Sequence, residues 1–302
     1  MSGKADSVRT IFLALGANFA IFVAKLVAAL VTGSGSMLAE AVHSLADCGN
    51  QVLLLIGMHQ ARRAPSPDHP LGYGMVVYFW SFLVALLLFS VGGVFSIYEG
   101  LHKLETLEPL RRPWLAVGVL VFGVAAETFS MWGCLREVNK ARGNHSLWRW
   151  FRESRQSELI VVFGEDLAAL LGLAFALAAV LAALLTGDPV FDAAGSIAIG
   201  VLLCVVAVFV AREVASLLVG QSAEPGLHTA LAEFVRAQPE VERVFNLITL
   251  QLGPDVMVAT KAQMHGALSG DELIAAINRV EAAMKARFPE IRWSFFEPDI
   301  AD

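Results

Sequence analysis

Residues Met37–Asn50, MLAEAVHSLADCGN, place three ionisable side chains inside an otherwise apolar run. Glu40, His43 and Asp47 follow one another at intervals of three and four residues, so a helix aligns them in one row. Ionisable groups are costly against lipid, and inside a membrane helix they indicate function by default. The row therefore predicts a helix that faces a polar interior. Because carboxylates and an imidazole are ligands for divalent metals, transport of a metal ion is the first hypothesis.

The composition is that of a helical membrane protein. The chain has 302 residues, of which 56% are hydrophobic and 17% charged, and its mean hydropathy is +0.63. Long stretches between residues 10 and 220 carry almost no charge, unlike a soluble enzyme of this length. The cysteines Cys48, Cys134 and Cys204 lie in apolar runs without CxxC spacing. We therefore expect neither disulfides nor a structural zinc finger.

Six apolar runs are long enough to cross a bilayer, which takes about 20 helical residues. The six runs are Thr10–Val31, Met37–Met58, Met75–Tyr98, Trp114–Leu135, Glu158–Leu185 and Pro189–Leu218. Short turns at residues 32–36 and 186–189 join the first run to the second and the fifth to the sixth. We expect a bundle of six membrane helices.

Basic residues near the ends of these runs are distributed unevenly. Three lie on one side of the expected bundle, namely Lys103, Arg111 and Arg112. Ten lie on the other side: Lys4, Arg9, Arg62, Arg63, Arg136, Lys140, Arg142, Arg149, Arg152 and Arg155. Because Lys and Arg accumulate on the cytoplasmic side, we expect both termini in the cytoplasm of a bacterial-type inner membrane.

From about residue 221 the pattern changes to that of a small water-soluble domain. Apolar and polar residues alternate in Val244–Leu252, Val256–Ala262 and Ile291–Phe295, which predicts three strands. Ser269 and Glu272 form a capping-box pattern at the start of a helix. With a further helix before the first strand, the order is α-β-β-α-β, as in a ferredoxin-like α+β domain.

The expected organisation is thus a transmembrane domain, residues 1–220, followed by a cytoplasmic domain, residues 221–302. The second part carries 7 Lys or Arg against 12 Asp or Glu, and the first part is nearly neutral, so nothing indicates nucleic acid. About 80 residues give a marginal core, and pairing with a second copy is therefore expected.

The candidate ligands lie on two of the expected helices. His43 and Asp47 are one turn apart; with ligand distances of about 2.0–2.2 Å the pair suits zinc and leaves two tetrahedral positions for another helix. On the fifth run Glu165 and Asp166 are adjacent, about 100° apart on a helix, so we expect only one of them to face the site. Small residues at intervals of four, beginning at Gly164, would let this helix approach the second closely.

Other polar residues are weaker candidates. The accessory candidates are Glu40, Asn50, Asp68, His69 and Asp192. The loop that contains Asp68 and His69 is rich in Pro and Gly, and a plain linker explains it better than a metal site. Lys25 is expected to pair with Glu40 or Glu127, and for Lys25 and Glu127 we favour structural roles.

Together these features resemble the cation diffusion facilitator family of zinc and manganese transporters. Residues 33–47, GSGSMLAEAVHSLAD, resemble its second-span signature, and residues 69–74, HPLGYG, resemble its loop before the third span. The resemblance implies a soluble tail that dimerises, and a transport site formed by a His or Asp and an Asp four residues later on each of the second and fifth spans.

Residue by residue, His43 and Asp47 match the first pair of ligands and Asp166 matches the last. Val162 stands where the family has its other ligand, and a valine cannot ligate a metal. This departure resembles a subgroup related to a mitochondrial or nuclear-associated zinc transporter, whose fifth span has Glu-Asp at this point. Glu165, Asn50 or water are the alternatives for the fourth ligand.

The expected function is efflux of a divalent cation, Zn²⁺ first, in exchange for protons by alternating access. Export of Mn²⁺ or Fe²⁺ is the alternative if oxygen ligands dominate the site. An intramembrane metalloenzyme is less favoured because HExxH is absent from the sequence, and a metal sensor is the third alternative. No resident cofactor is expected; the partners are the metal ion, protons, lipid and a second copy of the chain.

Overall fold

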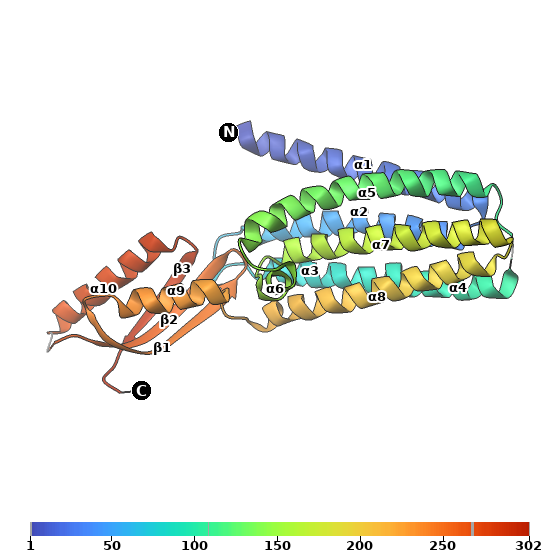
Figure 1. Ribbon diagram of the computed structural model, residues 1–302. Coiled ribbons are helices and arrows are strands. Elements are labelled where there is room, and N and C mark those ends of the chain that lie inside the picture. Colours follow the sequence, from blue (N-terminus) through green and yellow to red (C-terminus); the bar gives the residue numbers. More distant parts are fainter. Residues whose placement is uncertain (1, 108, 267–268, 302) are drawn as a thin grey trace. The chain divides into compact units, whose positions relative to one another are not determined.

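The computed structural model describes residues 2–107, 109–266 and 269–301, and for residues 2–14 and 17 it describes the backbone alone. The chain forms long helices and then a small α+β domain (Figure 1). It divides into two compact units. The helical unit contains Met1–Ile56, Trp80–Asn144 and Glu158–Glu213. The sheet unit contains Gly57–Phe79, His145–Ser157 and Val214–Asp302.

All six expected apolar runs are helical. The first, second, fourth, fifth and sixth are α1 (Ser2–Thr32), α2 (Gly35–Ala61), α5 (Pro113–Arg142), α7 (Ser157–Thr186) and α8 (Val190–Val219). The third comprises α3 (Val76–Leu87), the π-helical segment η1 (Leu88–Val94) and α4 (Phe95–Thr106). A short helix, α6 (Leu147–Glu153), precedes α7.

The third run was expected to end at Tyr98, but its helix continues to Thr106. It ends where Leu107 takes a left-handed backbone conformation and its N–H bonds to the carbonyl of Lys103. Hydropathy marks where the lipid-facing surface ends, whereas backbone hydrogen bonding continues into the polar residues that follow. Helix length was therefore underestimated here.

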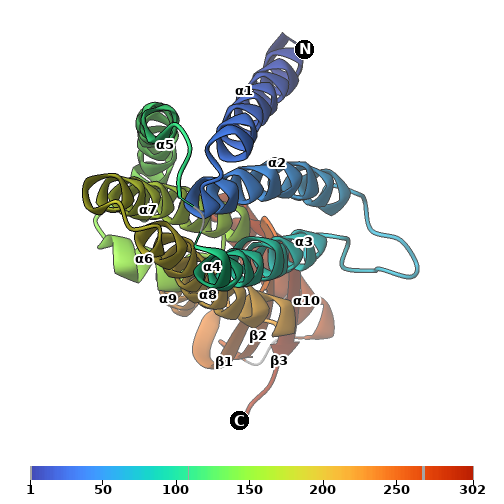
Figure 2. The same cartoon turned by 90° about the vertical axis from the view of Figure 1, so that its right-hand side faces the viewer.

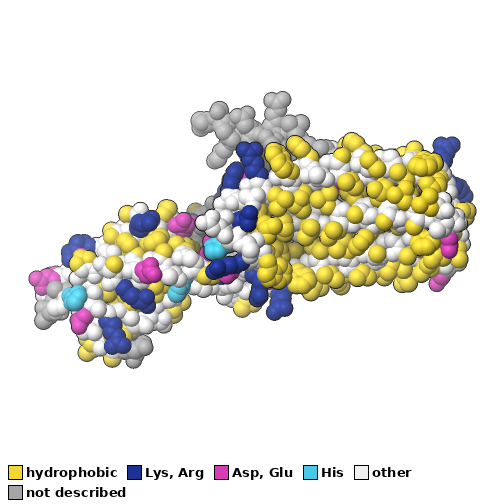
Figure 3. Space-filling view, in the orientation of Figure 1, with side chains coloured by type: hydrophobic (Ala, Val, Ile, Leu, Met, Phe, Trp, Pro, Cys, Tyr) yellow, Lys and Arg dark blue, Asp and Glu magenta, His cyan; other side chains and the backbone are white. Residues whose placement is uncertain are grey.

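The surface of the helical unit is suited to lipid. Within the described residues, four helices have the length and hydropathy to cross a membrane: Val76–Thr106, Pro113–Arg142, Ser157–Thr186 and Val190–Val219. Figure 3 shows hydrophobic side chains along the helices and charged ones near their ends. On α5, Phe129 is 74% exposed. Apolar exposure on this scale calls for a bilayer, and the chain is a helical membrane protein.

Helices α2 and α7 occupy the middle of the helical unit. In Figures 1 and 2 they lie between α1 and α5 on one side and α4 and α8 on the other. Small residues allow this close packing, because a Cβ on Gly172 of α7 would meet a Glu40 oxygen of α2 at 2.5 Å. A Cβ on Gly164 would meet Val210 of α8 at 2.7 Å. The small-residue face of α7 thus serves two neighbours rather than α2 alone.

Asp192 of α8 caps the start of α2. Its Oδ1 accepts a hydrogen bond from Ser34 Oγ at 2.6 Å, and its Oδ2 accepts one from the N–H of Gly35 at 2.7 Å. A buried carboxylate satisfies the free N–H groups at a helix start and complements the helix dipole. The sequence-based suggestion of Asp192 as an accessory metal ligand is corrected by these contacts, since both oxygens serve the helix end.

The sheet unit has the expected α-β-β-α-β order. Its elements are α9 (Pro225–Arg236), β1 (Val241–Leu252), β2 (Asp255–Met264), α10 (Gly270–Arg287) and β3 (Ile291–Pro298). β2 is central, antiparallel to β1 and parallel to β3, which it reaches through α10. The predicted capping box at Ser269 and Glu272 is present. The ferredoxin-like prediction is confirmed in its element order and in its small three-stranded sheet.

One face of this sheet packs on the helices and the other carries exposed apolar side chains. Val256 and Val258 of β2 are buried in the core with Leu231 of α9 and Val280 of α10. On the opposite face Ile248, Ala259 and Phe295 are register partners across the three strands. Ile248 and Phe295 are each 55% exposed. We call the row Ile248–Ala259–Phe295 the apolar row.

The cap on α2 gives a stability prediction. Asp192→Ala should lower the free energy of unfolding by about 2–3 kcal/mol, because it leaves buried N–H and hydroxyl groups unpaired. The matched control is Asp188→Ala, which removes an exposed cap from Val190 of α8 and should cost about 0.5–1 kcal/mol. Thermal unfolding of the detergent-purified variants measures both. Equal losses would contradict the assignment.

Candidate metal centre

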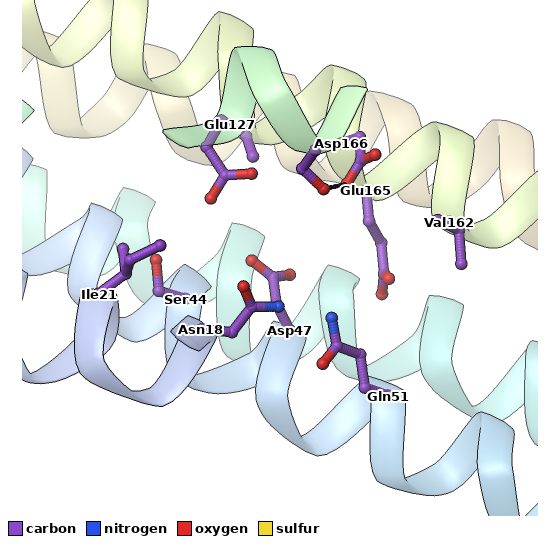
Figure 4. A pocket seen from close by; sticks show the side chains of 11 residues that line it. Asn18, Ile21, Ser44, Asp47, Gln51, Glu127, Val162, Glu165 and Asp166 are labelled. Carbon is purple, nitrogen blue, oxygen red and sulfur yellow. Dashed lines mark hydrogen bonds between the residues drawn. The ribbon is translucent and has the colours of Figure 1, made fainter. Parts of the chain in front are cut away.

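A cavity of about 70 Å³ lies among α1, α2, α5 and α7 of the helical unit. This volume holds several water molecules. Four acids line it, contributed by three helices (Figure 4). The lining residues are Asn18, Ile21, Ser44, Asp47, Gln51, Glu127, Ser130, Val162, Glu165, Asp166 and Ala169.

The acids face one another across the cavity. Figure 4 shows the carboxylate of Asp47 pointing from α2 into the space, and that of Glu127 pointing into it from the α5 side. Asp47 Oδ1 and Asp166 Oδ2 are buried and have no hydrogen-bond partner among the described residues. Buried acceptors without a protein partner require water or a cation. The cavity is therefore chemically suited to a positive ion.

His43 lies one turn before Asp47 on α2 and is fully buried. Its Nδ1 is 3.7 Å from Asp47 Oδ1, and within the described part of the chain both ring nitrogens lack a hydrogen-bond partner. Two ligands held tetrahedrally at about 2.1 Å from one ion are about 3.4 Å apart, so this pair is close to zinc-binding spacing. Of this pair, Asp47 lines the cavity and His43 does not.

The π-helical segment η1 packs beside His43. A Cβ on Gly92 would lie 4.0 Å from His43 Nδ1 and 3.2 Å from a methyl group of Leu203 on α8. Glycine at this point therefore lets α8 and the imidazole share a narrow space. π-helical turns occur frequently at functional sites, and this one adjoins the expected histidine ligand.

Glu165 and Asp166 both line the cavity, so the expectation that only one would face the site is wrong. Their hydrogen bonds go to different helices. Glu165 Oε1 accepts a hydrogen bond from Asn50 Nδ2 of α2, and Asp166 Oδ1 accepts one from Ser130 Oγ of α5 at 3.3 Å. The cavity extends far enough around α7 for positions 100° apart to reach it.

Val162 also lines the cavity, one turn before Asp166. The position of the family's usual ligand therefore faces the site here but presents only methyl groups. Carboxylates, amides and hydroxyls line the rest of the cavity. One of these carboxylates is Glu127, for which the sequence favoured a structural role. In the sequence Glu127 stands out only as a charge within an apolar run. The packing of α5 beside α7 is what places it at the cavity.

The groups do not yet enclose an ion. Among the described residues, no three His, Cys, Asp or Glu side chains lie close enough together to hold one. Asp47 on α2 and the acids on α5 and α7 stand on separate walls (Figure 4). Closure of the site would require these walls to approach one another.

The accessory candidates have other contacts. Glu40 accepts a hydrogen bond from Lys25 Nζ at 3.1 Å, which selects Glu40 over Glu127 as the partner of Lys25. Asn50 donates to Glu165, and its buried Oδ1 has no hydrogen-bond partner among the residues described. Neither Glu40 nor Asn50 lines the cavity. Asn50 thus positions a candidate ligand, while Glu40 compensates a charge.

The loop with Asp68 and His69 belongs to the sheet unit. His69 pairs through its backbone with Ser66 at 3.0 and 3.1 Å, and its ring stacks on Tyr73 with centroids 4.3 Å apart. Both Asp68 and His69 are exposed. These contacts make a compact turn, which agrees with a plain linker, and an accessory ligand role for Asp68 and His69 stays a prediction.

Comparison with known proteins identifies the class. The sequence model of the cation efflux transmembrane domain matches residues 11–219, which include every residue of the cavity. The chain belongs to the cation efflux, or cation diffusion facilitator, family of transporters.

Individual relatives refine the comparison. The chain is similar to the mitochondrial proton-coupled zinc antiporter SLC30A9 of Xenopus laevis, with 29% identity over 94% of this chain and 58% of that protein. It is 31% identical to metal tolerance protein C4 of Arabidopsis thaliana over 82% of this chain and 55% of that protein. A shorter match, 29% identical over 40% of each chain, is the magnetosome protein MamM of Magnetospirillum gryphiswaldense. The chain spans little more than half the length of the first two relatives.

The cavity predicts a binding role for Glu127. Glu127→Gln should weaken Zn²⁺ binding about tenfold, because it removes one of the carboxylates that face the ion. Glu137→Gln is the matched control, since Glu137 lies on the same helix, is exposed and pairs with Lys140. Isothermal titration of the purified variants measures the Kd. An unchanged Kd with lowered thermal stability would instead support the structural role.

Proposed function

We propose that this protein exports a divalent cation, with Zn²⁺ as the cargo, in exchange for protons. The observation that carries the proposal is the cavity itself, where Asp47 and Asp166 present unpartnered buried oxygens from two helices of a cation efflux domain. Relatives named as proton-coupled zinc antiporters support the choice of ion and of coupling.

Exchange for protons follows from the ligand chemistry. Carboxylates and imidazole bind a metal only after losing their protons, so metal and protons compete for the same groups. In a state open to the cytoplasm, His43, Asp47 and Asp166 would release protons and take up the ion. In a state open to the other side, protons would displace it. Approach and separation of the two cavity walls would supply the alternating access.

A second cargo has specific support. All the charged groups that line the cavity are carboxylates, since His43 lies beside it rather than in it. Oxygen-rich sites favour Mn²⁺ or Fe²⁺ relative to sites with more nitrogen or sulfur. Side-by-side comparison of metals therefore decides between zinc and these ions.

The orientation is proposed on charge. Basic residues accumulate at one end of the expected helices, ten against three, which supports cytoplasmic termini in a bacterial-type inner membrane. Two of the ten, Lys4 and Arg9, lie outside the described side chains. The other eight lie on the same side of the expected bundle and alone outnumber the three.

A homodimer through the sheet face is part of the proposal. The apolar row exposes Ile248 and Phe295, and the next row of register partners contains Lys261 and Glu297. Lys261 pairs with Asp299 of its own chain at 3.1 Å, so this row would form a polar border beside the apolar contact between two copies. Trp293, on the same face, has a buried indole N–H for which the residues that the structure describes offer no acceptor. These features favour a second copy as the occupant.

Transport is tested in proteoliposomes with a pH gradient. Wild-type protein should move Zn²⁺ against proton flow, and Asp47→Ala should reduce that flux at least about a hundredfold, because the loss of a buried ligand disables binding. Asp188→Ala, at an exposed helix start, is the control with near wild-type flux. Mn²⁺, Fe²⁺ and Co²⁺ are measured in parallel with a fluorescent indicator inside the vesicles.

The same assay separates the rival functions. Binding without flux would indicate a sensor, and hydrolytic turnover without flux would indicate an enzyme; either result overturns the proposal. Full flux in Asp47→Ala would exclude this cavity as the pathway. If Mn²⁺ or Fe²⁺ moves faster than Zn²⁺, the proposed cargo changes to that ion and the proposed exchange for protons stands.

The dimer face predicts a second outcome. Phe295→Arg should shift the protein from dimer to monomer, because it places a charge in the centre of the apolar contact. Ile274→Arg is the matched control: Ile274 is 58% exposed but lies on α10, on the helical side of the sheet. Light scattering of detergent-solubilised protein measures the mass. A monomeric wild type, or dissociation by the control alone, would overturn this interface.

A further inference from the structure

Lys25 of α1 is an ammonium group buried within the helical unit. It is 1% exposed, and its Nζ donates hydrogen bonds to Glu40 Oε2 at 3.1 Å and to Ser44 Oγ at 2.8 Å. A buried ion pair carries a large desolvation cost, so it is weak support for stability alone. Charged groups inside a membrane bundle usually serve function.

The pair is oriented with respect to the cavity. Ser44, which accepts from the ammonium, is one of the lining residues, whereas Glu40 is not. The carboxylate of Glu40 turns toward α7, where Gly172 leaves it space. The Lys25 ammonium is thus linked to a residue of the cavity lining by one hydrogen bond, and the Glu40 carboxylate is directed toward α7.

Electrostatics then gives the pair a defined effect. Asp47, Glu127, Glu165 and Asp166 bring negative charge to the cavity, and a nearby ammonium opposes a divalent cation through the low-dielectric interior. A transported ion has to be held firmly enough to enter and weakly enough to leave. A fixed positive charge beside the site reduces affinity while stabilising the carboxylates when they are empty.

We propose that Lys25, held by Glu40 and Ser44, is a fixed internal charge that lowers the affinity of the transport site and thereby speeds release of the cation. Lys25 acts through space and through Ser44, so it is a tuning residue and not a ligand. The inference rests on the proposed function of the cavity and adds a determinant of its turnover.

A purely structural ion pair and one that tunes the site predict different signs for the change in cation affinity when each charge is removed. If the pair only joins α1 to α2, removing either charge leaves the other buried alone, and both changes destabilise in the same way. If the pair tunes the site, removing the positive charge strengthens cation binding and removing the negative charge weakens it. The double neutral variant should then return towards the wild-type affinity.

The experiment uses the full-length protein with Lys25→Met, Glu40→Gln and the double variant. Lys25→Met should lower the Kd for Zn²⁺ about fivefold or more, and Glu40→Gln should raise it by a similar factor. In proteoliposomes Lys25→Met should lower both KM and kcat, because release becomes slower. Lys140→Met, which removes an exposed ammonium on α5, is the control and should change neither value.

Two further variants guard against a loss of folding. Lys25→Arg keeps the charge and should keep the wild-type Kd, and Ser44→Ala should lower the Kd less than Lys25→Met, since the pair remains. Shifts of Kd in the same direction for Lys25→Met and Glu40→Gln, or no shift, would overturn the inference. If Lys25→Met does not fold, a wild-type Kd in Ser44→Ala together with a wild-type Kd in Glu40→Gln overturns it instead.

The failure of the proposed function looks different. If the wild-type protein neither binds nor transports any of the four metals, both the proposed site and the tuning role of Lys25 are overturned. A wild type that transports while the Lys25 and Glu40 variants keep its Kd, KM and kcat overturns the tuning role alone.

Discussion

Hydrocarbon cannot solvate charge, and the structure of the helical unit follows from this constraint. The acids of α2, α5 and α7 turn inward to a common cavity, while large apolar side chains cover the outside. Lys25 and Glu40 neutralise each other within the bundle at 3.1 Å. The described acids at the cavity and the Lys25–Glu40 pair thus keep their charges away from lipid, and this requirement favours the observed helix arrangement.

Close packing makes the arrangement possible. Gly172 lets α7 approach the carboxylate of Glu40, and Asp192 holds the start of α2 from α8. Helix α2 is thereby fixed at one end by a cap and along its length by the ion pair. The candidate pair His43 and Asp47 follows these two restraints along α2, and His43 lies beside the segment η1.

The site differs from the usual family arrangement in a way that bears on the cargo. Val162 replaces a ligand with hydrocarbon, and Glu127, Glu165, Ser130 and Gln51 surround the space with oxygen and amide groups. On α7 a valine thus replaces a possible ligand, while α5 and α7 both bring acids to the cavity. Under the proposed function, the choice between zinc and a harder ion would depend on how many of these oxygens contact the cation.

Local patterns in the sequence determined the apolar helices, the order and pairing of His43 and Asp47, the capping box at Ser269, and the strands of the sheet unit. These features depend on periodicity and nearest neighbours, which a sequence displays directly. Tertiary structure alone decided that Glu127 reaches the cavity, that Glu165 and Asp166 both do, that Lys25 pairs with Glu40, and that Asp192 caps a helix. The reason is physical: helical spacing fixes which side chains share a face, but only the packing of one helix against another fixes what that face meets.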